Sequence, residues 1–208
     1  MHYWREQYFE TLRNAAADVV RESVSWQDYA DFCLEYERGL RSQAFLILER
    51  FMSRMEHEHF MERRRFVSWL MRTAEGRDGR HMLIPHPLAI RIVEPTLLEW
   101  TEVEPSSSEP HRWIGGPEHL EKAIELDPMD QIAPKKLVIV LLSQVGNNTH
   151  ELPHGYLGSA SQDLATLSRV ETLLPRLANE DDRAAYAADI AEERYVIHEH
   201  VRRQSRTS

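Results

Sequence analysis

Residues 120–130, LEKAIELDPMD, combine the end of one helix with the start of another. Apolar residues recur at three- and four-residue intervals up to Leu126, which is the spacing of a helix that buries one face. Pro128 cannot extend that helix, because its nitrogen has no hydrogen to donate and its ring clashes inside a helix. Asp130 carries the short polar side chain that caps a following helix. The stretch therefore predicts a seam between two helices, with Pro128 as the stop and Asp130 as the restart.

The same helical pattern covers most of the chain. Glycine is scarce, with 8 residues among 208, and the alternation of apolar and polar residues that marks strands is almost absent. The apolar run at 137–142 would favour a strand in isolation, but a lone strand would have no partner, so we predict a helix there. We predict an all-α fold of irregular antiparallel helical hairpins, which form either a stacked α-α superhelix or a bundle.

Glycines, prolines and capping residues divide this pattern into separate helices. Between residues 45 and 74 the sequence allows either one helix or two, because the segment around Glu56 contains neither glycine nor proline. A helix over 85–104 is expected to be kinked by Pro95. The predicted helices cover residues 3–22, 26–38, 42–74, 85–104, 111–114, 117–127, a segment after Asp130 that includes 137–142, 162–177 and 181–203.

A polar segment with two glycines, at 75–80, is the clearest candidate for a domain boundary. We predict an N-terminal helical part at 1–75, a linker at 76–84 and a second, repeat-like helical part at 85–208. One continuous domain is the alternative, because a chain of this length can form a single large core.

Composition and charge argue against several classes of protein. The formal net charge of −9 argues against a nucleic-acid binder, which needs clustered lysine and arginine. No apolar run approaches the roughly 20 residues that span a bilayer, and the first residues lack the pattern of a secretory signal. The single cysteine, Cys33, has apolar neighbours, as expected of a small buried side chain in a reducing compartment. We therefore expect a cytoplasmic protein that binds neither nucleic acid nor membrane.

The hexapeptide at 123–128 resembles the end of a tetratricopeptide repeat, a family in which helix pairs of about 34 residues stack with a proline at each turn. Leu120, Ala123 and Pro128 match second-helix positions of that repeat. Further matches are the helix-end pattern at 104–105, the pair at 114–115, and Trp26, Tyr29, Ala30, Cys33, Ala44, Leu48 and Phe51. The sequence departs from the family between Pro105 and Pro128, which are closer together than one repeat. A bundle with one repeat-like helix end is the alternative.

This resemblance implies a non-enzymatic scaffold that needs no cofactor and binds a protein or peptide partner in a groove between helix pairs. The candidate partner-binding residues are Arg112, Lys135, His150, His154 and Tyr156. Two of them, Arg112 and Lys135, occupy first-helix positions that usually face such a groove. The others lie in the long irregular connection at 146–158, and functional side chains concentrate on loops of that kind. A structural subunit of a homo-oligomer is an alternative, because the apolar run at 137–142 could cover a second copy.

A second alternative is a zinc-dependent hydrolase. His150, Glu151 and His154 match the pattern H-E-x-x-H, in which a helix places two imidazoles on one face of a metal and the glutamate acts as base. Glu171 is the candidate third ligand. Pro153 lies inside the motif and disfavours the continuous helix that this chemistry requires. No metal ligand is therefore part of the leading prediction.

Overall fold

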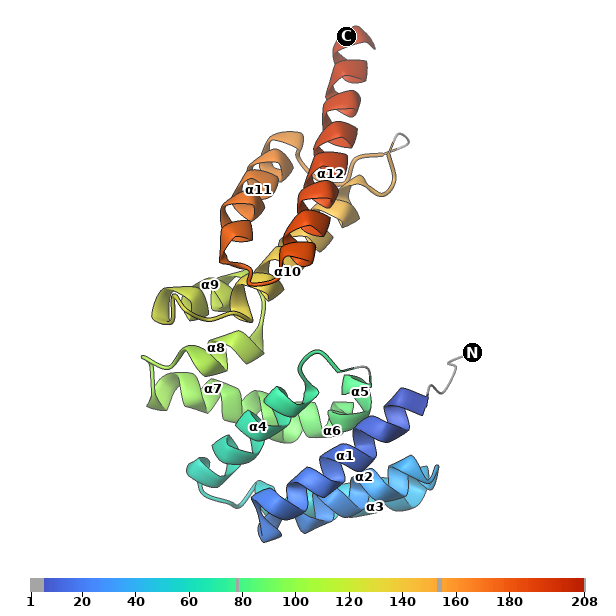
Figure 1. The fold of residues 1–208 in the computed structure, drawn as a ribbon, viewed down its shortest axis with the longest axis vertical. Helices are drawn as coiled ribbons and strands as arrows, with labels where there is room; N and C mark the ends of the chain where they lie inside the picture. Colours follow the sequence, from blue (N-terminus) through green and yellow to red (C-terminus); the bar gives the residue numbers. More distant parts are fainter. Residues whose placement is uncertain (1–5, 78, 153–154, 208) are drawn as a thin grey trace. The chain divides into compact units, whose positions relative to one another are not determined.

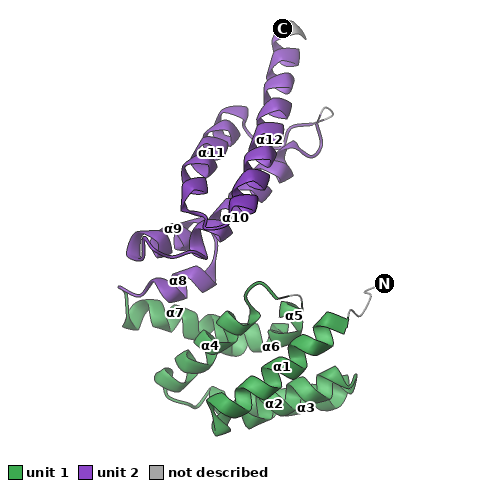
Figure 2. Cartoon of the chain, viewed as in Figure 1, with its two compact units in different colours: residues 1–105 green, residues 106–208 purple. Residues whose placement is uncertain are grey.

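A computed structural model describes residues 6–77, 79–152 and 155–207. These residues are helical and contain no strand, which confirms the all-α prediction. The chain divides into two compact units, residues 1–105 (unit 1) and residues 106–208 (unit 2) (Figures 1 and 2). The predicted linker at 76–84 thus lies inside unit 1, and the division falls after Pro105, at the turn before the short helix that carries Trp113.

Unit 1 contains all of the helices up to Val103. Its elements are α1 (Glu6–Glu22), the 3-10 turn η1 (Val24–Trp26), α2 (Gln27–Glu37), α3 (Arg41–Met55), α4 (Phe60–Ala74), α5 (Arg80–Leu83), α6 (His86–Leu88), the π-helical segment η2 (Ala89–Val93) and α7 (Glu94–Val103). The chain breaks between α3 and α4, so residues 45–74 form two helices. The π-helical segment ends at Val93, two residues before Pro95; a proline removes one backbone donor from the helical ladder, and local widening accommodates that loss.

The core of unit 1 is aromatic. Phe66 lies at its centre, with its ring centroid 4.8 Å from that of Phe51 and 5.1 Å from that of Tyr29. The fully buried large side chains of this unit include Trp26, Tyr29, Phe32, Phe51, Phe66 and Trp100. Such rings bury a large area each and prefer the tilted and edge-on contacts that are seen here.

This core also explains why the glycine-containing segment does not separate two domains. The Tyr29 hydroxyl donates a hydrogen bond of 2.7 Å to the carbonyl oxygen of Leu83, and both residues are fully buried. Met82 is also buried, and α5 packs against α1 and α4. Local composition predicted a linker, but the apolar residues that follow the second glycine, Gly79, join the core of unit 1 instead.

Unit 2 is a series of helices in which each packs against the next. Its elements are α8 (Ser108–Ile114), α9 (Pro117–Leu126), α10 (Ala133–Thr149), α11 (Ala160–Leu173), the 3-10 turn η3 (Leu174–Arg176) and α12 (Glu180–Thr207). Helices α10, α11 and α12 lie side by side, as Figure 1 shows. The apolar run at 137–142 belongs to α10, so the prediction of a helix rather than a strand is confirmed. The core is aliphatic and consists of Leu120, Ala123, Ala133, Leu137, Val138, Leu141, Val145, Leu167, Val170, Leu173, Ile190 and Ile197.

The seam between α9 and α10 is built as its sequence predicts. Helix α9 ends at Leu126, and the chain turns through Pro128. The Asp130 carboxylate then accepts hydrogen bonds from the backbone N–H groups of Ile132, at 2.7 Å, and Ala133, at 3.0 Å. Because the first N–H groups of a helix have no partner within it, Asp130 stabilises the start of α10.

Candidate functional site

Unit 2 contains a groove that is open to solvent. It has a volume of about 480 Å³ and lies among α9, the start of α10 and α11. The lining residues are Glu121, Ile124, Glu125, Pro128, Leu137, Arg169, Thr172, Leu173 and Arg176. Volumes of about 300–1,000 Å³ are typical of small-ligand pockets, so this groove can hold a few side chains of a partner.

The apolar part of the groove comes from the core of the unit. Leu137 and Leu173 are buried members of the aliphatic cluster, and Ile124 packs against that cluster. Pro128 is exposed at the groove, so the residue that ends α9 also shapes its wall. The same helix stop that divides α9 from α10 thus opens apolar surface to solvent.

Three of the four charged groups at the groove are neutralised within the protein. Glu121 of α9 forms an ion pair with Arg169 of α11, which joins two walls of the groove. Glu125 pairs with Lys122 on the same helix at 3.0 Å. Arg176 is exposed and has no ion-pair partner among the described residues. The groove therefore combines apolar surface with one uncompensated guanidinium group.

The structure places Arg112 and Lys135 away from this groove and in ion pairs of their own. The Arg112 Nε atom donates to the Asp130 carboxylate at 2.5 Å, and the Arg112 side chain is only 16% exposed. Lys135 Nζ lies 2.6 Å from the Asp182 carboxylate at the start of α12. Both side chains were predicted to face a partner from their repeat positions, whereas their contacts here hold the helices of unit 2 together.

The H-E-x-x-H motif begins at the end of a helix. Helix α10 ends at Thr149, and His150 caps it, with Nδ1 2.7 Å from the carbonyl oxygen of Asn147. Its Nε2 atom lies 3.1 Å from the Glu151 carboxylate. His154 lies outside the described residues. A zinc site of this class needs the motif on one helix face, and that helix does not continue past Thr149 in the described part of the motif.

The proposed third zinc ligand has a different partner. Glu171 accepts two hydrogen bonds from Arg194 of α12, at 2.7 and 2.9 Å, and these bonds lower the pKa of its carboxyl group below the usual range. Across residues 6–77, 79–152 and 155–207, no group of three or more histidine, cysteine, aspartate or glutamate side chains is arranged to hold a metal ion.

Tyr156 ties the long connection between α10 and α11 to the body of unit 2. Its hydroxyl donates a hydrogen bond of 2.7 Å to Asp163, a carboxylate that also accepts from Asn148 Nδ2 at 3.0 Å. Asp163 is buried. Burial and the neighbouring Asp163 carboxylate raise the pKa of Tyr156 well above its usual range. These contacts give Tyr156 a structural role in the connection.

A histidine pair, which the sequence interpretation did not single out, joins α8 to α9. The Nδ1 atoms of His111 and His119 are 2.9 Å apart, and their ring centroids are 5.1 Å apart. Burial, followed by the proximity of His119 and Lys122, lowers the pKa of His111. The sequence does contain a signal for this pair: one histidine lies on each side of a Gly-Gly turn between two predicted helices.

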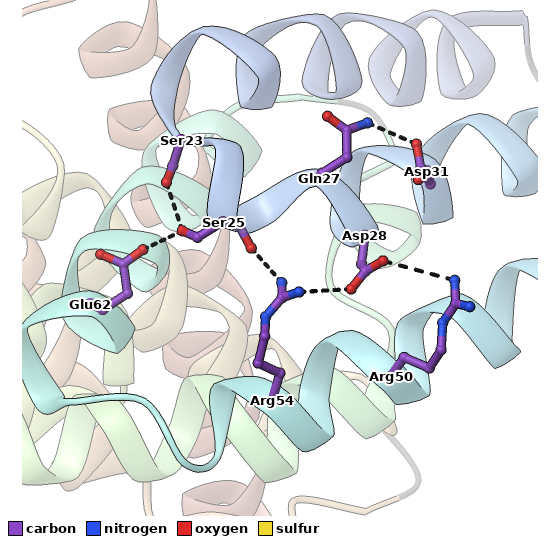
Figure 3. Close-up of polar contacts among 8 residues, drawn as sticks. All are labelled: Ser23, Ser25, Gln27, Asp28, Asp31, Arg50, Arg54 and Glu62. Carbon is purple, nitrogen blue, oxygen red and sulfur yellow. Dashed lines mark hydrogen bonds and ion pairs between the residues drawn. The ribbon is translucent and has the colours of Figure 1, made fainter.

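Unit 1 carries a polar network that joins four of its elements (Figure 3). The Ser25 hydroxyl donates to Glu62 at 2.7 Å, and the Trp26 indole N–H donates to the same carboxylate at 2.8 Å. Arg54 of α3 donates to the Ser25 carbonyl oxygen and, at 2.9 Å, to the Asp28 carboxylate. No histidine belongs to the network that the figure draws, so we interpret it as the tie that joins η1 and α2 to α3 and α4.

Comparisons with protein-family models, with curated proteins and with solved structures find no match to this chain. The resemblance to tetratricopeptide repeats therefore stays a prediction based on the residues around Ala123 and Pro128. Within the described part of the chain, each helix is either too short or too polar to cross a bilayer.

Proposed function

We propose that this protein is a non-enzymatic helical scaffold, and that the groove of unit 2 binds a peptide segment of a protein partner. The segment carries one apolar side chain and, a few residues away, one carboxylate. The observation that supports this proposal is the combination of open aliphatic surface with the uncompensated Arg176 guanidinium.

The lining of the groove is the reason that we propose an apolar side chain in the bound peptide. The partly buried Ile124 and the exposed Pro128 present apolar surface beside the buried Leu137 and Leu173, and an entering leucine, isoleucine or methionine side chain would bury apolar area against it. Grooves of this kind between helices are a recurring mode of peptide recognition. Polar side chains also line the groove, but Glu121, Glu125 and Arg169 are held in ion pairs, so the groove offers few free polar groups to a small polar metabolite.

Arg176 is the reason that we propose a carboxylate in the bound peptide. Its guanidinium group can form a bidentate pair with a carboxylate, and that geometry adds specificity to the charge attraction. The protein carries a formal net charge of −9, so an acidic segment needs a local cation to bind. The arginine without an ion-pair partner beside apolar surface therefore makes this groove suited to an acidic peptide.

A displayed library of random peptides, selected against the immobilised full chain, tests the proposal. We expect an enriched pattern in which one aliphatic residue lies a few positions from an aspartate or glutamate. A synthetic peptide with that pattern should bind about tenfold more weakly to Arg176→Glu. The matched control is Arg77→Glu, which makes the same charge change on unit 1 and should leave the affinity unchanged.

Two results would contradict the proposal. One is an enriched pattern that lacks an acidic residue, or none at all. The other is binding that responds equally to Arg176→Glu and to Arg77→Glu, since a general change of net charge would then explain the loss. Self-association of the chain through the groove, detected by a sizing column and abolished by Arg176→Glu, would identify a second copy as the occupant instead.

A further inference from the structure

The turn between α8 and α9 brings two imidazoles together. Gly115 and Gly116 have φ values of 76° and 75°, a region that glycine adopts easily and other residues rarely do. The chain therefore reverses within two residues, and α8 packs against α9. His111 lies in the last turn of α8 and His119 in the first turn of α9, so their side chains meet across the turn.

The distance between the two Nδ1 atoms fits two ligands on one metal ion. Imidazole nitrogens bind Zn²⁺ and similar ions at about 2.0–2.1 Å, so two ligands at right angles on one ion lie about 2.9 Å apart. Two ligands at a tetrahedral angle lie about 3.3–3.4 Å apart. The observed Nδ1–Nδ1 distance is 2.9 Å. It matches neighbouring positions in a square-planar or tetragonal complex, which is the geometry that Cu²⁺ and Ni²⁺ prefer.

The protonation chemistry allows an ion to replace the hydrogen bond. Without an ion, one ring donates its Nδ1 hydrogen to the Nδ1 lone pair of the other ring. When an ion binds both Nδ1 atoms, the donating ring keeps its hydrogen on Nε2 instead. This is a change of tautomer in a neutral imidazole, so binding releases no proton, and both rings need only rotate toward the ion.

The surroundings are compatible with a divalent ion. Lys122 is the cation whose charge acts on His111, and its ammonium group forms an ion pair of 3.0 Å with Glu125. That carboxylate offsets the repulsion between the lysine and an incoming ion. Both rings are partly exposed, so water can complete the coordination of the ion.

We infer that His111 and His119 form a two-histidine chelate for a tetragonal divalent transition-metal ion, with Cu²⁺ bound more tightly than Ni²⁺ or Zn²⁺. The order follows from the general affinity series of nitrogen ligands, in which Cu²⁺ stands highest. This inference does not depend on the peptide-binding groove, because neither histidine lines it.

The test titrates the full chain with Cu²⁺, Ni²⁺ and Zn²⁺ separately, with calorimetry for affinity and electron paramagnetic resonance for the copper ligands. All variants carry His2→Gln, because a histidine beside a free amino terminus chelates copper by itself. We expect one equivalent of Cu²⁺ with a tetragonal spectrum and hyperfine coupling from two imidazole nitrogens. His111→Gln and His119→Gln should each weaken Cu²⁺ binding at least about tenfold, since each removes one of two protein ligands.

The matched control is His198→Gln, which removes a histidine from α12 and should leave the copper affinity unchanged. Circular dichroism checks that each glutamine variant keeps the helical content of the parent. Equal copper binding by the parent and by His111→Gln or His119→Gln would overturn the inference. So would a spectrum with a single nitrogen ligand, or tighter binding of Zn²⁺ than of Cu²⁺.

Discussion

The two units of this protein fill their cores with different side chains. In unit 1 the aromatic rings of α2, α3 and α4 pack on one another, whereas unit 2 relies on leucine, valine, isoleucine and alanine from α9 to α12. Large flat rings fill the space between helices of unit 1. In unit 2 the smaller aliphatic side chains leave the groove beside Leu137 and Leu173 open. The difference shows that the two cores are filled in different ways, with stacked rings in unit 1 and with branched aliphatic side chains in unit 2.

The ion pairs of the two units can be compared in the same way. In unit 1, Arg91 forms bonds of 2.7 Å with Glu49 of α3 and of 2.7 Å with Glu56, the residue after α3, so its charge is compensated within the unit. In unit 2, the pair of Arg112 with Asp130 is buried, but Arg176 lacks a partner in the part of the chain that the structure describes. Arg176 thus places a charge without an ion-pair partner beside the apolar lining of the groove in unit 2.

The largest effect is expected from a substitution in the core of unit 1. Phe66→Ala removes a fully buried ring from the centre of the aromatic cluster and should lower the free energy of unfolding of unit 1 by about 3–5 kcal/mol. The rate of Cys33 alkylation reports on the opening of unit 1, because the thiol is fully buried and burial raises its pKa to about 12. We expect the alkylation rate to rise at least about a hundredfold, since the thiol reacts only after opening.

The control for this variant is Leu46→Ala, which truncates a side chain that is 65% exposed and should change the stability by less than about 0.5 kcal/mol. In Phe66→Ala, the copper affinity of the His111–His119 pair reports on unit 2 and should stay the same. If copper binding is lost together with the protection of Cys33, the two units unfold as one and the comparison between them fails.

A smaller effect is expected at the seam of unit 2. Asp130→Ala removes the cap of α10 and leaves the Arg112 guanidinium without its carboxylate, so the free energy of unfolding should fall by about 2–4 kcal/mol. Urea denaturation followed by circular dichroism measures it. Asp130→Asn should cost less, because an asparagine side chain still caps the helix. The double variant with Arg112→Leu should be more stable than Asp130→Ala alone; equal stability would show that Arg112 gains nothing from the pair.

The smallest expected effect is at the groove. Glu121→Gln breaks the exposed ion pair with Arg169 and should change the stability by less than about 1 kcal/mol. It leaves a second guanidinium without a partner beside the groove. The affinity for an acidic peptide, measured by fluorescence anisotropy, should therefore rise about two- to threefold. A loss of affinity would show that the pair itself forms part of the binding surface.

Much of the fold could be predicted from the sequence because the signals are local. The stop at Pro128, the cap at Asp130 and the helix end at Gly39, whose φ is 79°, each depend on a few neighbouring residues. The unit boundary could not be predicted, because the burial of Leu83 against Tyr29 depends on residues 54 positions apart.

The candidate sites were harder to predict than the helices. Arg112 was assigned to a partner because its repeat position usually faces a groove, but its carboxylate partner lies eighteen residues away, in a turn. Arg176 lacks an ion-pair partner among the described residues, and His111 contacts His119, because of the way the helices pack and turn. Residue type and spacing show where such groups lie on a helix and do not show which groups from other helices they meet.

The turn at Gly115 and Gly116 also has a stereochemical consequence. A Cβ atom added at either glycine would meet nothing within 4 Å, so packing does not require glycine there. Backbone handedness does: the Gly115 dihedrals of 76° and −166° are the mirror image of an extended conformation that L-residues favour. A D-alanine at Gly115 would fit where an L-alanine would be strained, and it would restrict the unfolded chain. The chirality of the backbone alone thus fixes the sequence at this turn.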